Sequence, residues 1–165
     1  MNLSLLRPLL ILLAVPNGAQ AEPARPVLRS EVPAAVEAEL ATRETLCRLD
    51  GLGPILLPEG SIARSELNQD GRDDYIVALC RLGCGGEAAR ITRACDQSLI
   101  FLSSDTGYQS TRMPGELLDI RRIPGGPVKL LSSAVDSDAP CPVEDGVCNP
   151  LYELRNGELV QAGIE

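Results

Sequence analysis

The spacing of apolar and polar residues changes near residue 60 of the 165-residue chain. From Ser61 onward, apolar residues alternate with polar ones or form short runs. This is typical of antiparallel β-strands, because successive side chains of a strand point to opposite faces. Asn156-Gly157 lies between two such runs and is a strong signal for a two-residue hairpin. The pattern predicts strands at residues 61–64, 75–80, 98–103, 108–112, 117–123, 128–134, 151–155 and 158–162.

One segment before residue 60 has the spacing of a helix. Val36, Leu40 and Cys47 fall on one stripe of a helix expected within residues 30–49, which ends where Asp50-Gly51 follows. The connector "GLGPILLPEG" at 51–60 holds too many glycines and prolines for regular structure. We therefore expect an α+β fold, with one N-terminal helix followed by a twisted antiparallel sheet of hairpins.

The first 21 residues have the features of a secretory signal peptide. Arg7 is the only charge, an apolar run follows at 9–15, and "AQA" provides small residues for cleavage. The apolar run is far shorter than the roughly 20 residues of a membrane-spanning helix, so we expect no membrane insertion. The sequence predicts a periplasmic or secreted protein, with 22–29 as a flexible lead-in and 30–165 as a single disulfide-stabilised domain.

Six cysteines in an exported chain predict three disulfides. Such bonds would supplement a thin core, because the chain has three Tyr, one Phe and no Trp. A zinc site is the less favoured use of the cysteines, because their spacing contains no CxxC pair. The zinc ligands would be Cys80, Cys84 and Cys95. The expected pairs are Cys47–Cys80, Cys84–Cys95 and Cys141–Cys148, with Cys80–Cys95 as an alternative.

The stretch "ELNQDGRDDY" at 66–75 places oxygen-bearing side chains at alternate positions before a glycine. Alternate side chains of a tight loop can point to a common centre, and calcium prefers 6–8 hard oxygen ligands. The alternative is an Asx-type turn without an ion, with its carboxylates neutralised by Arg64 or Arg72. The predicted calcium ligands are Glu66, Asn68, Asp70, the backbone carbonyl of Arg72, and Asp74.

This loop resembles the calcium loop of FG-GAP and VCBS repeats, whose pattern DxDxDGxxD leads directly into a β-strand, as "ELNQDGRDDYIV" does here. The resemblance implies a structural calcium ion at the junction of two strands of a propeller-like blade. An EF-hand is not implied, because Val77 stands where its bidentate glutamate would be. Glu66 and Asn68 depart from the Asp of the repeat pattern. Residues 33–163 are also similar to a family of small exported alphaproteobacterial proteins of unknown function, which implies no activity.

Little in the composition points to catalysis, and we expect no enzyme. The chain has no histidine, which removes Ser-His-Asp and Cys-His nucleophiles. A net charge of −8 argues against binding nucleic acid. The acidic residues of the last third are expected in a solvated surface loop rather than as a glycosidase pair; they are Asp136, Asp138, Glu144 and Asp145.

Two functional hypotheses remain. The first is a non-catalytic extracytoplasmic binding or envelope-associated module of unknown ligand, stabilised by calcium at 66–74. The second is an acidic secreted inhibitor of a basic hydrolase such as a lysozyme or a protease, because a strong negative field steers cationic partners. The partner expected is an unknown protein, for which the acidic charge favours a basic one, and we expect a monomer.

Overall fold

The computed structural model describes residues 24–85, 97–123, 125–133 and 149–164. The predicted signal peptide, the pair Cys141–Cys148 and the acidic residues at 136–145 lie outside these ranges.

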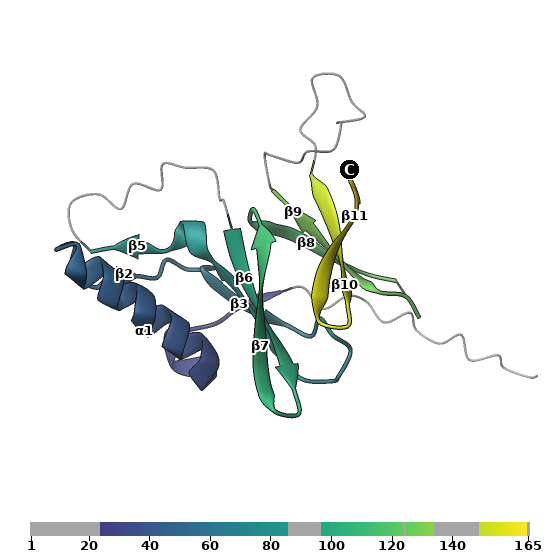
Figure 1. Ribbon diagram of the computed structural model, residues 1–165, viewed down its shortest axis with the longest axis horizontal. Helices are drawn as coiled ribbons and strands as arrows, with labels where there is room; N and C mark the ends of the chain where they lie inside the picture. The colour runs from purple at the N-terminus through teal and green to yellow at the C-terminus, as the bar shows by residue number, and fades with distance from the viewer. Residues whose placement is uncertain (1–23, 86–96, 124, 134–148, 165) are drawn as a thin grey trace, which may run out of the picture.

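The described residues form three layers (Figure 1). Helix α1 (Ala34–Leu49) covers one face of a five-stranded sheet, and a four-stranded sheet covers the other face. In spatial order, the five-stranded sheet contains β1 (Arg25–Pro26), β3 (Ile62–Ser65), β4 (Asp74–Ala78), β6 (Gln97–Ser104) and β7 (Gly107–Pro114). The four-stranded sheet contains β11 (Glu158–Ile164), β10 (Pro150–Arg155), β9 (Val128–Ser132) and β8 (Leu117–Arg122). Every pairing in both sheets is antiparallel.

Smaller elements connect these layers. Strands β2 (Ile55–Leu56) and β5 (Gly83–Cys84) pair with each other near α1. Two short 3₁₀ helices, η1 (Arg29–Glu31) and η2 (Leu79–Arg81), precede α1 and follow β4.

The central strands β4 and β6 of the five-stranded sheet are apolar on both faces, which explains the position of this sheet between the other two layers. In β4, Tyr75 and Val77 pack toward α1 with Val36 and Leu40, whereas Ile76 packs in the cluster shared with the four-stranded sheet. Strand β6 repeats this division, and all five residues of β4 are buried. Period-two alternation therefore separates two cores, one on each side of the same strands.

The predicted α+β class is confirmed, but the hairpins form two main sheets instead of one. The chain leaves the five-stranded sheet after Pro114, and Gly115 adopts a φ of 73°. Proline has no backbone N–H with which to pair in a sheet. Serine hydroxyls donate hydrogen bonds to the two backbone carbonyls at this corner. Ser98 donates to Gly115 O at 2.9 Å, and Ser132 donates to Pro114 O. The corner directs β8 into the second sheet.

Each predicted strand has a counterpart, and the Asn156-Gly157 hairpin is confirmed by positive φ values of 52° and 82°. The differences concern short segments. Strand β2 lies in the connector that was expected to be irregular. Residues 24–29 belong to the segment expected as a flexible lead-in, yet β1 pairs with β3 there.

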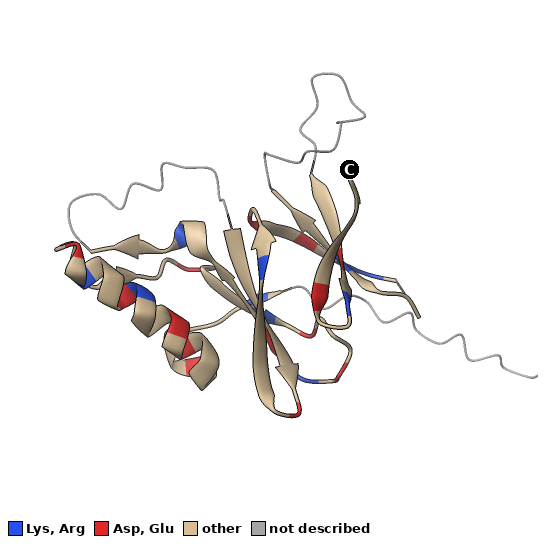
Figure 2. Cartoon of the chain, viewed as in Figure 1, with Lys and Arg blue, Asp and Glu red and all other residues tan. Residues whose placement is uncertain are grey.

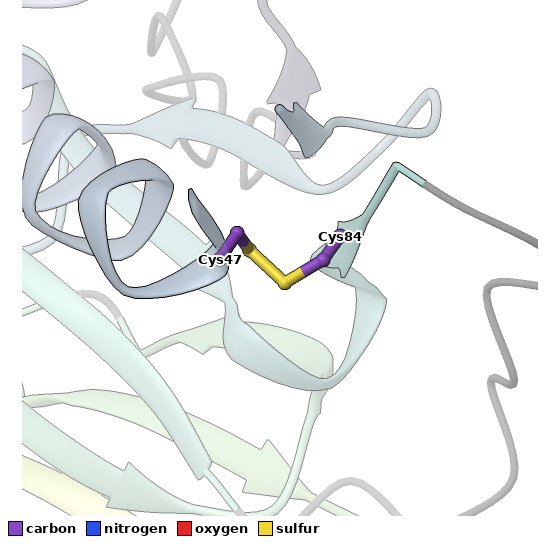
Figure 3. The surroundings of a disulfide bond; sticks show 2 residues. All are labelled: Cys47 and Cys84. Atoms are coloured by element: carbon purple, nitrogen blue, oxygen red, sulfur yellow. A yellow bond between two sulfur atoms is a disulfide. The ribbon is translucent and has the colours of Figure 1, made fainter. Parts of the chain in front are cut away.

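The disulfide pairing differs from both predictions made for Cys47 and Cys84. These two cysteines bond to each other across a Cα–Cα distance of 5.4 Å (Figure 3). The β2–β5 pairing places Cys84 opposite Ile55, beside the end of α1 that carries Cys47. The predicted bonds Cys47–Cys80 and Cys84–Cys95 are therefore wrong. The zinc site that required Cys84 is also wrong.

Cys80 also takes part in a disulfide, whose partner lies outside the described residues. The alternative pair Cys80–Cys95 depends on Cys95, which is likewise outside them.

No helix in the described part of the chain is long and apolar enough to cross a membrane.

Candidate functional site

The loop at 66–73 connects β3 to β4, which are antiparallel neighbours with Ser65 opposite Asp74. Two residues of the loop adopt left-handed conformations, Gln69 with φ 63° and Gly71 with φ 79°. The glycine allows the sharp bend at no steric cost. The loop thus joins two neighbouring strands, and its side chains determine what it can bind.

Asp74 is the first residue of β4, directly after the loop, and its side chain points inward. Its carboxylate is fully buried and accepts hydrogen bonds from three backbone N–H groups and from a serine hydroxyl whose single hydrogen it shares with Asp70. The N–H groups of Leu67 and Asn68 donate to Oδ2 at 2.5 and 3.1 Å. Ser103 of β6 donates to Oδ1 through its N–H at 2.7 Å and its hydroxyl at 2.9 Å. Burial raises the pKa of Asp74, and these hydrogen bonds oppose that shift.

Asp70 and Asn68 are also engaged with donors of the same chain. Asp70 accepts hydrogen bonds from the Arg72 N–H at 2.8 Å and the Ser103 hydroxyl at 2.8 Å. Asn68 donates to the Ser103 carbonyl at 2.7 Å, and its Oδ1 accepts from the Asp70 N–H at 3.2 Å. Desolvation acts to raise the pKa of Asp70, but the hydrogen bonds from Ser103, Arg72 and Asn68 outweigh it and hold the pKa below its usual value.

Glu66 turns away from the other acids and faces Arg122 of β8. Arg122 Nη1 lies 3.1 Å from Glu66 Oε2, and Nη2 donates to the Glu66 carbonyl and to Ser65 Oγ. Glu66 Oε1 and Arg122 Nε are buried and have no hydrogen-bond partner among the described residues. The unpartnered oxygen thus belongs to a side chain already paired with a fixed cation, which disfavours a metal ion there. The contact also links the two main sheets.

Arg72 and Arg64 form ion pairs with acidic residues that are not among the predicted calcium ligands. Arg72 donates to the Ser104 carbonyl at 2.8 Å and pairs with Asp105 at 2.6 Å. Arg64 pairs with Asp73 at 3.2 Å. These exposed ion pairs hold the loop against the β6–β7 hairpin and against β3.

The arrangement does not fit a calcium site built from the five predicted ligands. Calcium requires several oxygens that converge with free lone pairs. Here N–H and O–H donors engage both oxygens of Asp74 and both of Asp70, and Glu66 is directed to Arg122. In the described ranges, no group of three or more His, Cys, Asp or Glu residues is arranged to hold a metal ion.

Sequence reasoning missed the two residues that organise this region, Ser103 and Arg122. Both come from strands distant in sequence, 29 and 56 residues from their partners Asp74 and Glu66. Serine in an apolar strand was the available signal for Ser103, because a buried hydroxyl requires a partner.

The chain was compared with family models, curated proteins and solved structures. No family model, no curated protein and no solved structure matches it.

Proposed function

We propose that this protein is a non-catalytic extracytoplasmic domain that acts as a binding module. The observation that supports the proposal is the use of the loop carboxylates within the chain itself. Asp74 accepts hydrogen bonds from three backbone N–H groups and a serine hydroxyl, and Glu66 pairs with Arg122. These contacts favour a structural role for the two acids at the junction of β3, β4 and β6.

Export is supported by two features. Residues 1–21 have the composition of a signal peptide, and Cys47 and Cys84 form a disulfide, a bond typical of oxidising compartments. Cell fractionation tests this part of the proposal. We expect the chain without its first 21 residues in the extracytoplasmic fraction, whereas recovery of uncleaved, reduced protein from the cytoplasm would contradict export.

The non-catalytic role is tested by complementation of a strain that lacks the gene. Asp70→Asn and Glu66→Gln preserve shape and remove charge. We expect each variant to restore the wild-type phenotype to the extent that its measured stability allows, as a structural role requires. A variant that is as stable as wild type but fails to complement would show that a loop carboxylate takes part directly in function.

A second candidate is the acidic inhibitor of a basic hydrolase, supported by the net charge of −8. A lysozyme or protease assay with excess protein at low ionic strength tests it. Full enzyme activity under those conditions would remove this candidate.

A further inference from the structure

A groove opens where β1 and β3 diverge. The Val27 N–H donates to the Ile62 carbonyl at 3.1 Å, which closes the pairing of the two strands. Beyond this bond, residues 26–29 and 57–62 separate and enclose a cavity of about 480 Å³. A cavity of this size can hold a small ligand or a few residues of a peptide.

Both walls of the groove are held in place by the fold. On one side, residues 58–61 form a turn in which the Ser61 N–H and hydroxyl both donate to the Pro58 carbonyl, at 3.0 and 2.6 Å. Gly60 at its third position has a φ of 77°, as a type II turn requires. The turn presents Glu59 toward solvent. A wall fixed in this way loses little entropy when a ligand binds.

The other wall is held by Arg29. Its guanidinium contacts Glu37 at 2.6 Å and Glu44 at 2.9 Å, both on α1. These carboxylates compensate the Arg29 charge, so it does not make the groove basic. Figure 2 shows that acidic and basic positions are interspersed along α1, the helix that supplies both partners.

The lining combines apolar side chains with uncompensated negative charge. Val27, Leu28, Leu57 and Ile62 line the groove, and Leu28 is 70% exposed. Glu59 in the lining forms no ion pair with any residue in the described ranges. An occupant that matches this surface therefore has an apolar side chain and a positive charge beside it.

We propose that this groove binds an extended peptide segment in which an apolar residue is adjacent to Lys or Arg. The proposal rests on the proposed function and names the site and the class of partner. Two observations favour a peptide. The groove continues from the short edge strand β1, where added strands can pair. The unpaired carboxylate of Glu59 complements a basic residue, and the net charge of the chain steers such a partner toward the groove.

The test uses the full mature, oxidised protein and two capped peptides, Lys-Leu-Val-Lys and Glu-Leu-Val-Glu, followed by methyl NMR. We expect the basic peptide to shift the methyl signals of Val27, Leu57 and Ile62 in a saturable manner, and the acidic peptide to shift none of them. Glu59→Gln should weaken binding of the basic peptide by roughly two- to five-fold, the range that an exposed ion pair gives.

Glu158→Gln is the matched control, because Glu158 is an exposed glutamate on β11, outside the groove lining. It should leave the affinity unchanged. Leu28→Ala removes an exposed apolar side chain with little risk to folding, and we expect it to weaken binding as well.

Three results would overturn the proposal. They are the absence of any shift at several millimolar basic peptide, shifts outside the groove, and equal weakening by Glu59→Gln and Glu158→Gln. The last result would indicate attraction by net charge alone. Each of these leaves the complementation experiment on the loop unaffected, so failure of the groove is distinguishable from failure of the proposed function.

Discussion

Asp74 supplies the acceptor that Ser103 would otherwise lack. The ladder between β4 and β6 ends at the pair Tyr75 and Phe101, while β6 continues to Ser104. The Ser103 N–H therefore lies beyond the last partner in β4. Asp74 Oδ1 accepts from this N–H at 2.7 Å and from the Ser103 hydroxyl at 2.9 Å. A buried side chain thus supplies the acceptor at the end of the β4–β6 ladder, as buried N–H groups require.

Ser103→Ala tests this contact. The variant keeps the N–H bond but removes the hydroxyl, whose single hydrogen Asp74 and Asp70 share. We expect a loss of about 1–3 kcal/mol in the free energy of unfolding, because the buried carboxylate of Asp74 loses a donor. Denaturant unfolding measures it. Ser110→Ala on β7, an exposed serine, is the control and should change the free energy by less than about 0.5 kcal/mol. Equal effects of the two variants would contradict the assignment.

Calcium gives a second prediction. The loop oxygens are engaged by protein donors, so we expect the same thermal unfolding midpoint in millimolar calcium and in chelator. Asp70→Ala should lower the midpoint equally under both conditions. A bound ion at 100 times its Kd would stabilise the folded chain by about 2.7 kcal/mol. A calcium-dependent rise that disappears in Asp70→Ala would show that the loop rearranges to bind the ion.

The cluster around Arg29 predicts a pH dependence. Hydrogen bonds from Arg29 lower the pKa values of Glu37 and Glu44 below their usual value. A carboxyl group whose folded pKa is depressed stabilises the protein above its unfolded pKa, and this contribution is lost as pH falls. We expect stability to decline below about pH 4.3, the usual glutamate pKa.

Arg29→Met should reduce this decline, and high salt should reduce it in the wild type because the groups are partly exposed. Chemical unfolding at several pH values provides the measurement. An unchanged pH profile in Arg29→Met would assign the acid sensitivity to other carboxylates.

The disulfide gives a fourth prediction. Cys47 and Cys84 are separated by 37 residues, for which the loop-entropy model gives about 4 kcal/mol of stabilisation. The double variant Cys47→Ser with Cys84→Ser should therefore unfold at markedly lower denaturant concentration. Non-reducing peptide mapping should recover a peptide pair joined through these two residues. Recovery of Cys47 linked to Cys80 would contradict the pairing.

Elements whose positions depend on local residue spacing could be predicted from the sequence. The stripe of Val36, Leu40 and Cys47 lies on the buried side of α1, because helical periodicity alone decides which face is apolar. Asn156-Gly157 forms its turn because few other dipeptides adopt positive φ at both positions.

Contacts between distant residues could not be predicted in this way. The two-residue pairing of β2 with β5 is too short to leave a periodic signal, yet it determines that Cys84 rather than Cys80 reaches Cys47. The oxygens at 66–74 were predicted as calcium ligands, because a linear pattern does not record their hydrogen-bond partners. Ser103 reaches Asp74 through the pairing of β4 with β6, and Arg122 reaches Glu66 through the packing of the two sheets.

The Cys47–Cys84 bond also affects how α1 can move. It joins the last turn of the helix to β5, and the helix otherwise rests on the five-stranded sheet through the side chains of one stripe. If those contacts open transiently, the disulfide is a second covalent link that holds the end of the helix near its docking face, so the effective concentration for redocking is higher than with the polypeptide connection alone. Reduction of the bond would allow α1 to separate as an independent unit of local unfolding, and amide hydrogen exchange in α1 would then accelerate while β4 and β6 remained protected.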